Sequence, residues 1–196
     1  MGTPIVFVDR PPGRIRADCV LLDNVGGARL AVGHLIAHGH RRIAILGDRL
    51  EVYTLGKRHR GYLDALEAAG LPVDPALVRF GCHDTADASA AVRELLQLPS
   101  PPTAIFATNN RMSVGCVDVL AERDTRVALV GFDDFELAGA LRVPVTVVSY
   151  DNRELGHRAA EILFDRLDGG DGPPIRVTLK THLIERGSGE FAPPGG

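Results

Sequence analysis

Residues 104–109 read Ala104-Ile105-Phe106-Ala107-Thr108-Asn109, an unbroken apolar run that ends on polar side chains. An apolar run without polar alternation is typical of a strand that is covered on both faces, as strands in parallel sheets are. Two further runs have this form and end on aspartates: Ile5-Val6-Phe7-Val8-Asp9 and Val127-Ala128-Leu129-Val130-Gly131-Phe132-Asp133-Asp134. Because ligands of parallel sheets bind at the carboxyl ends of the strands, we expect these polar side chains to serve a binding site.

Strand and helix patterns alternate along almost the whole chain. Helices are predicted over 25–38, 56–69, 85–97, 110–122 and 152–167. Strands are predicted over 4–8, 19–23, 43–46, 77–81, 103–108, 127–131, 145–149, 175–180 and 182–185. This order predicts an α/β fold with a mostly parallel sheet.

Composition narrows the class of protein. The net charge of -3 over 196 residues argues against a nucleic-acid-binding surface on this chain itself. No apolar run is long enough to span a bilayer. The three cysteines, Cys19, Cys82 and Cys116, are odd in number and lack C-x-x-C spacing. We therefore expect reduced thiols in a cytoplasmic protein.

Eight short segments in a fixed order resemble the effector-binding region of the LacI/GalR family of transcription regulators. They are Val6-Phe7-Val8-Asp9-Arg10, Asp23-Asn24 before Gly27-Ala28, Gly39-His40-Arg41-Arg42-Ile43-Ala44, Arg58 with Gly61-Tyr62, Pro102-Thr103-Ala104-Ile105-Phe106-Ala107-Thr108-Asn109, Val130-Gly131-Phe132-Asp133-Asp134, Glu154-Leu155-Gly156 and Leu183-Ile184-Glu185-Arg186-Gly187-Ser188. The resemblance extends from residue 4 to residue 188.

The resemblance implies a fold like that of type I periplasmic sugar-binding proteins, with two α/β lobes, parallel sheets, three crossovers and a cleft. Residues 1–22 and 152–178 are then expected in the N-terminal lobe, and residues 23–148 and 179–188 in the C-terminal lobe. The N-terminal lobe is expected to be incomplete and the chain truncated at its N-terminus, without the family's helix-turn-helix headpiece. The Gly/Pro-rich tail 189–196 is expected to be disordered.

Four polar residues match effector-contacting positions of the family: Asp9, Arg58, Asn109 and Asp133. A guanidinium fork suits vicinal hydroxyls, while an amide and a carboxylate can clamp adjacent hydroxyls. Plainer roles compete for three of them. Asp9 can form a loop turn, Arg58 can be one cation of a solvated face, and Asn109 can cap helix 110–122, as its neighbour Asn110 equally can.

His83 and Tyr150 match two further contact positions of the family, where a ring can stack on a sugar. His83 can equally be an ordinary loop histidine. The set suits a sugar effector, although members of the family also take nucleobases and nucleosides. No cofactor is expected.

The resemblance also implies a homodimer, and helix 110–122 with loop 137–144 is the expected C-lobe surface. Val114, Val117 and Leu141 are the candidates there, with a core role as the alternative. A metal site at His34, His38 and His40 is not expected. The three lack a nearby carboxylate, and cations near a helix C-terminus explain them better.

The chain is thus expected to be the ligand-sensing part of a DNA-binding regulator or repressor, reaching operator DNA only through a headpiece missing here. An enzyme is not expected, because no nucleophile elbow, phosphate loop or tuned acid–base pair is evident. A transport-type sugar-binding protein is the alternative, since it shares the fold and would use similar side chains.

Overall fold

The computed structural model describes residues 3–123 and 126–194, which divide into two compact units. Of these, residues 3–23 and 150–181 form unit 1, and residues 24–149 and 182–194 form unit 2. The chain passes between the units three times, after Asp23, Ser149 and Thr181. That the units are the two lobes of an effector-binding region stays a prediction.

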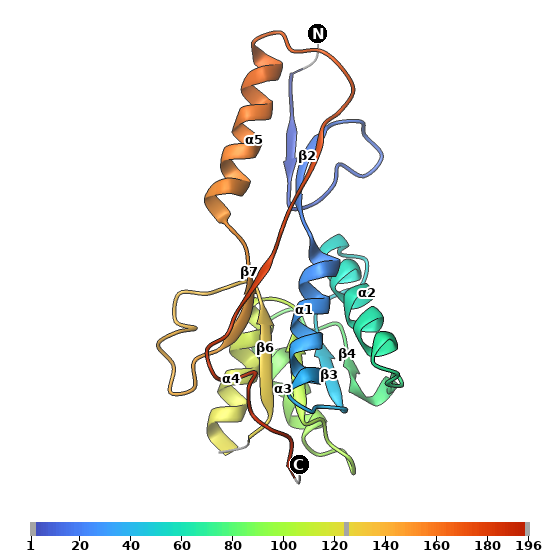
Figure 1. Ribbon diagram of the computed structural model, residues 1–196, viewed down its shortest axis with the longest axis vertical. Coiled ribbons are helices and arrows are strands. Elements are labelled where there is room, and N and C mark those ends of the chain that lie inside the picture. The colour runs from blue at the N-terminus through green and yellow to red at the C-terminus, as the bar shows by residue number, and fades with distance from the viewer. Residues whose placement is uncertain (1–2, 124–125, 195–196) are drawn as a thin grey trace. The chain divides into compact units, whose positions relative to one another are not determined.

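A six-stranded sheet forms the centre of unit 2, in the order β4-β3-β5-β6-β7-β9 (Figure 1). The strands are β3 (Ile43–Leu46), β4 (Val78–Arg79), β5 (Ala104–Ala107), β6 (Ala128–Phe132), β7 (Thr146–Ser149) and β9 (His182–Ile184). All neighbouring strands are parallel except β9, which runs antiparallel to β7. The predicted α/β fold with a mostly parallel sheet is confirmed.

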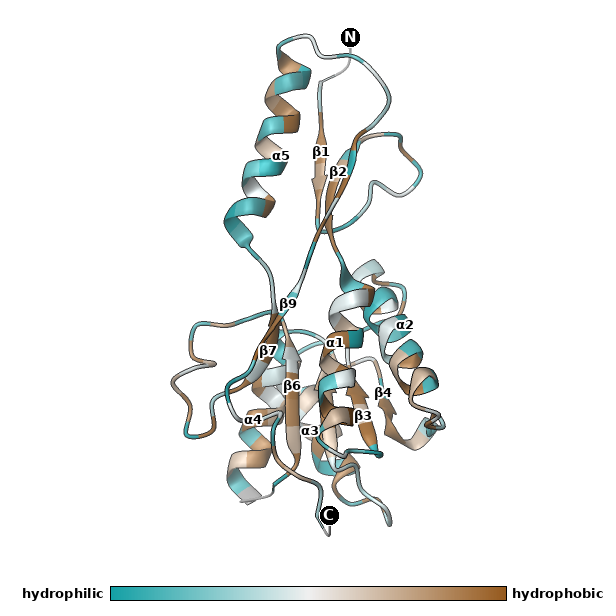
Figure 2. Cartoon of the chain, in the orientation of Figure 1, coloured by the Kyte–Doolittle hydropathy of each residue, from teal (hydrophilic) through white to brown (hydrophobic). Residues whose placement is uncertain are grey.

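Helices cover both faces of this sheet, which explains why its strands are continuously apolar (Figure 2). Ile45 and Phe106 pack in a core with α1 (Asn24–Ala37) and α2 (Tyr53–Ala68). Leu46 and Ile105 pack in a second core with α3 (Thr85–Leu95) and α4 (Asn110–Arg123). Among the described residues, no helix combines the length and the apolar content needed to cross a membrane.

Unit 1 has a parallel three-stranded sheet in the order β1-β2-β8, with one helix. Its elements are β1 (Val6–Val8), β2 (Asp18–Leu22), β8 (Arg176–Leu179) and α5 (Asn152–Leu167). The Asp151 carboxylate caps α5 by accepting hydrogen bonds from the amides of Arg153 and Glu154. Arg166 near the other end of α5 forms a two-bond ion pair with Asp18 of β2, which lowers the pKa of that carboxyl. The Arg166–Asp18 ion pair fixes α5 to its sheet.

Helix α2 starts three residues before the predicted position 56, at Tyr53. Val52 stands at its N-cap, and no side chain there hydrogen-bonds the first turn. Sequence patterns locate helix starts mainly by capping Ser, Thr, Asp or Asn, so this start carries no such signal. The longer helix places Arg58 in its second turn.

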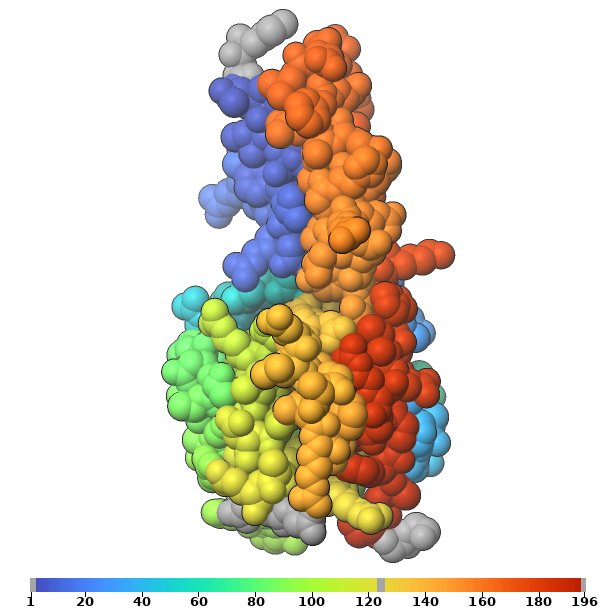
Figure 3. Space-filling model, turned by 90° about the vertical axis from the view of Figure 1, so that its left-hand side faces the viewer, coloured from blue at the N-terminus to red at the C-terminus, as the bar shows by residue number. Residues whose placement is uncertain are grey.

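The prediction of a disordered tail over 189–196 is wrong for its described part, residues 189–194. The C-terminal segment, Arg186 to Phe191, packs on the rest of unit 2 beside the loop before β7 (Figure 3). The buried Ser188 hydroxyl donates to the Leu129 carbonyl and accepts from the Thr146 amide (2.9 Å). Glu190 accepts a hydrogen bond from Thr146 at 3.0 Å. Composition could not predict these hydrogen bonds, because the partner groups lie far away in the sequence. Residues 195–196 lie outside the described residues.

Candidate functional site

Arg58 and Asp133 form a two-bond ion pair at the carboxyl end of β6. The Arg58 Nη1 lies 3.0 Å from Asp133 Oδ2, and its Nη2 lies 3.2 Å from Oδ1. The Arg58 side chain is 5% exposed, whereas that of Asp133 is 24% exposed. The pair therefore holds a buried positive charge beside a carboxylate that solvent or a ligand can reach.

Further contacts fix the Arg58 guanidinium. Its Nε donates to Asn24 Oδ1 at 2.8 Å, and Nη1 also donates to the Thr108 carbonyl at 2.6 Å. The guanidinium carbon lies 3.6 Å from the centre of the Phe132 ring, a cation–π contact. The alternative of Arg58 as one cation of a solvated face is therefore wrong.

A glycine one turn further along α2 allows this arrangement. A Cβ on Gly61 would clash with the Val25 carbonyl and would come within 2.7 Å of the Ala28 Cβ. Only glycine lets α1 and α2 approach so closely at this point. The close approach brings Arg58 within hydrogen-bonding distance of Asn24, the first residue of α1.

Asp133 has a left-handed backbone conformation, with φ of 70°. Among the described residues, Asp9 is the only other non-glycine residue with a positive φ, at 65°. Each of these aspartates directly follows a strand, and its backbone amide donates a hydrogen bond to a carbonyl of the neighbouring strand. Backbone strain of this kind persists where the surroundings impose it, and such residues cluster at functional sites. It therefore marks the two aspartates that the sequence singled out.

Asn109 follows β5 and caps α4. Its Oδ1 accepts a hydrogen bond from the Met112 amide at 3.0 Å, so the capping role falls to Asn109 and not to Asn110. Within the described chain, its side-chain nitrogen donates no hydrogen bond. Capping thus fixes the orientation of the side chain while two N–H groups remain for a ligand.

His83 lies in the loop between β4 and α3, paired with a residue that sequence reasoning missed. Its Nδ1 lies 2.8 Å from Asp48 Oδ1, and its side chain is 61% exposed. Asp48 follows β3, just as Asn109 follows β5. The rule that polar residues at strand ends mark a binding edge would have found it.

Because the strands stand in the order β4-β3-β5-β6, these residues form a row along one edge of the sheet. The row runs from His83 through Asp48 and Asn109 to Asp133. Four of the six predicted effector residues thus belong to unit 2: His83, Asn109, Asp133 and, next to Asp133, Arg58. Asp9 and Tyr150 belong to unit 1, where Tyr150 packs against its small core. Their role in effector binding stays a prediction.

The residues predicted for a dimer surface are half-buried on unit 2. Val117 of α4 and Leu141 of the loop before β7 line a mainly apolar hollow of about 520 Å³. Arg126 and Arg142 also line it, together with Phe191 of the C-terminal segment. Val114 lies one turn before Val117 on α4. These contacts are compatible with either a core or a surface role.

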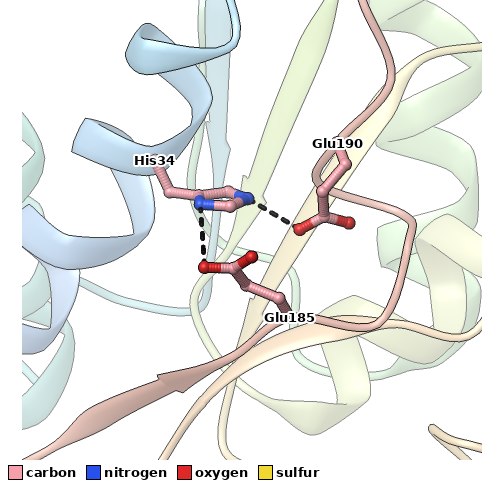
Figure 4. A group of neighbouring side chains, drawn as sticks. All are labelled: His34, Glu185 and Glu190. Carbon is pink, nitrogen blue, oxygen red and sulfur yellow. Dashed lines mark hydrogen bonds and ion pairs between the residues drawn. The ribbon is translucent and has the colours of Figure 1, made fainter.

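Two glutamates that the sequence reading missed approach His34 (Figure 4). The His34 Nε2 lies 2.7 Å from Glu190, and its Nδ1 lies 4.0 Å from Glu185. A metal ion would bond one ring nitrogen, whereas here the two nitrogens face different carboxylates. The arrangement ties the C-terminal segment to α1. His38 pairs with the His34 carbonyl, and buried His40 pairs with Thr103 and Phe191.

Comparisons with known proteins agree with this geometry. Residues 32–189 match the family model described as periplasmic binding protein-like domain. Over 194 residues the chain is 37% identical to the HTH-type transcriptional regulator CelR of Thermobifida fusca, and the alignment covers 96% of this chain and 57% of that protein. The chain therefore spans little more than half the length of such relatives.

Solved structures give the same picture. A complex of the transcriptional regulator CelR with cellobiose has 36% identity and a TM-score of 0.86, covering 93% of this chain and 58% of that one. A regulatory protein of the LacI family from Chloroflexus aggregans has 31% identity and a TM-score of 0.88, covering 94% and 68%. The chain therefore belongs to the periplasmic binding protein-like domain family and, within it, to the LacI/GalR family of transcription regulators.

Proposed function

We propose that this chain is the ligand-sensing part of a transcription regulator and that it binds a sugar through Arg58, Asn109 and Asp133. The observation that carries the proposal is the preformed Arg58–Asp133 pair, with distances of 3.0 and 3.2 Å, at the carboxyl edge of a parallel sheet. A carboxylate held by a buried arginine keeps accepting capacity for hydroxyls, and Asn109 adds donors beside it.

Cellobiose is the first candidate effector, because the CelR relative was solved in complex with cellobiose. Binding of the sugar would change the affinity of the whole regulator for its operator, by stabilising one conformation over another. The proposal includes a cytoplasmic location, because operator DNA lies in the cytoplasm, and it includes no catalytic activity. A transport-type binding protein would use similar side chains, but the relatives above are named as regulators.

We also propose that the regulator forms a homodimer through the surface around Val117 and Leu141. A mainly apolar hollow of about 520 Å³, lined by residues of α4, of β6 and of the loop before β7, gives a second copy an apolar surface to cover. Val114 on the same helix would extend this surface.

Titration calorimetry on the 196-residue chain tests effector binding. The ligands are cellobiose, maltose, glucose, ribose and adenosine. Binding of at least one sugar is expected, together with its loss in Arg58→Gln. Arg60→Gln is the matched control, since Arg60 lies on the same helix and its side chain is 67% exposed. Sugar binding that survives in Arg58→Gln, or binding of adenosine alone, would contradict the proposal.

A further inference from the structure

The hollow beside α4 has the size and the walls of a small-molecule site. Its volume of about 520 Å³ lies within the range of about 300–1,000 Å³ that is typical of ligand pockets. It reaches the sheet, because buried Leu129 of β6 and buried Val145, directly before β7, line it. Val143, which is 41% exposed, also lines it. The hollow therefore presents apolar surface that a ligand can cover.

Two arginines from different segments give the hollow its charge. Arg126 precedes β6, Arg142 lies in the loop before β7, and both are exposed. Among the described residues, neither arginine forms a hydrogen bond or an ion pair, and no carboxylate lines the hollow. The polar group of Ser188 is already bonded to the backbone of Leu129 and Thr146. The hollow thus combines apolar walls with two positive charges that no described carboxylate neutralises.

This combination suits a carboxylate that has an apolar body. A guanidinium and a carboxylate form short, charge-assisted hydrogen bonds. Each methylene group that moves from water to an apolar wall raises the affinity about fourfold. A sugar offers neither the charge nor the apolar length. The hollow and the Arg58–Asp133 pair therefore suit different ligands.

A second copy seated on the hollow would not by itself neutralise these charges. In a two-fold dimer the same surface faces itself, so a contact centred on the hollow brings Arg126 and Arg142 of both copies together. Like charges brought together at an interface oppose association. A carboxylate bound in each hollow would offset this repulsion, so such a ligand is compatible with the proposed homodimer.

We propose that the hollow is a second ligand site, separate from the sugar site, and that it binds a small carboxylate with an apolar chain. The chain covers Leu129, Val143 and Val145, and the carboxylate pairs with the two arginines. Binding strengthens self-association, a consequence that rests on the proposed homodimer. The site itself does not depend on sugar binding.

Titration calorimetry with octanoate on the 196-residue chain tests the site. Octanoate is expected to bind at least about tenfold more tightly than butyrate, which has four methylenes fewer, and than neutral octanamide. The double variant Arg126→Gln, Arg142→Gln is expected to bind octanoate about tenfold more weakly than the wild type. Arg29→Gln is the matched control, because Arg29 is an exposed arginine of α1 that does not line the hollow.

A second variant tests the place of binding without removing a charge. Ala121→Trp puts a large side chain into the hollow from an exposed position of α4, and it is expected to abolish octanoate binding while leaving the fold intact. Octanoate that binds this variant and the double variant as it binds the wild type would lie elsewhere, which contradicts the site. No binding to the wild type, or equal binding of octanamide, contradicts it too.

Light scattering with and without octanoate separates this inference from the proposed homodimer. The fraction of dimer at a fixed protein concentration is expected to rise when octanoate is added. An equal fraction of dimer in both conditions contradicts the effect on association and leaves the homodimer standing. A monomer in both conditions contradicts the homodimer, and calorimetry still decides the site.

Discussion

The guanidinium carbon of Arg58 lies 3.6 Å from the centre of the Phe132 ring, while the same guanidinium binds both carboxylate oxygens of Asp133. Phe132 and Asp133 are consecutive residues at the end of β6. The end of β6 thus supplies both the aromatic ring and the carboxylate that contact the buried Arg58 guanidinium. Planarity and a fixed fork of donors are what this arrangement requires.

Lysine should therefore fail at position 58, although it keeps the charge. An ammonium group cannot stack on Phe132 and bind both Asp133 oxygens while also reaching Asn24. We expect Arg58→Lys to lose sugar affinity at least about tenfold, equivalent to about 1.4 kcal/mol, measured by calorimetry. Arg60→Lys on the same helix should bind like the wild type. Equal affinities for Arg58→Lys and the wild type would show that charge alone is sufficient there.

Removal of the Asp133 carboxylate should destabilise unit 2 even without a ligand. Asp133→Ala leaves the buried Arg58 charge without its partner and places alanine at a φ of 70°. We expect a loss of about 2–3 kcal/mol in unfolding free energy, below the range for fully buried pairs because Asp133 is partly exposed. Asp133→Asn should cost less, since asparagine tolerates this conformation and keeps an acceptor oxygen.

Urea unfolding followed by circular dichroism measures this difference. Asp118→Ala, at an exposed position of α4, serves as the control and should lie within about 0.5 kcal/mol of the wild type. If Asp133→Ala unfolds at the same urea concentration as that control, the buried pair does not stabilise the unit.

How much of this site the sequence could predict depends on how local each signal is. The apolar runs of β5 and β6, with Asn109 and Asp133 at their ends, could be read directly, because burial on both faces leaves a continuous local pattern. Asp48 obeys the same rule but lies outside the family resemblance and was missed. The partners of Arg58 could not be read, since Asn24 is 34 positions away and Asp133 is 75.

The C-terminal segment shows the limit most clearly. Glu190 meets His34 across 156 positions of sequence, and composition predicted disorder there. Phe191 is the one large apolar residue in the Gly/Pro-rich tail, and a single residue gives no periodic pattern. Here the order comes from packing of Phe191 against the core with α1 and α2, and from hydrogen bonds of Ser188 and Glu190 to groups fixed by other elements. Such contacts depend on the tertiary structure and leave no local pattern.

The free energy of unfolding should decrease as the pH drops below about 6.5, because of His40. Burial lowers the pKa of His40 below its usual value of 6.5, an effect that its bond to the Phe191 carbonyl opposes and that nearby His38 reinforces. The unfolded chain therefore takes up the proton first as pH falls. The His40 contribution is fully present above pH 6.5 and is lost as pH drops through the lowered folded-state pKa.

The variant His40→Gln removes this titration while keeping a donor for the Phe191 carbonyl. Its thermal midpoint should vary less between about pH 7 and pH 5 than that of the wild type. Burial lowers the pKa of His59 as well, so part of the slope should remain. His157→Gln, at an exposed histidine, should keep the full slope. Identical slopes for His40→Gln and the wild type would show that His40 is not the titrating group.

Charge placed beside the hollow on α4 should prevent self-association. We expect the wild-type chain to be a dimer by light scattering and Val117→Lys to be a monomer, since a further cation would be buried at the interface beside Arg126 and Arg142. Val73→Lys is the control, because Val73 is 46% exposed and does not line that hollow. A wild-type chain that is monomeric at every concentration would contradict the proposed surface.

The most direct test of sugar binding at the strand ends of unit 2 is a crystal structure of the chain grown with cellobiose. We expect sugar hydroxyls within about 3.2 Å of the Asp133 carboxylate and the Asn109 amide, with the Arg58–Asp133 pair intact. Cellobiose bound elsewhere on the chain, with Asp133 and Asn109 free of sugar, would contradict it.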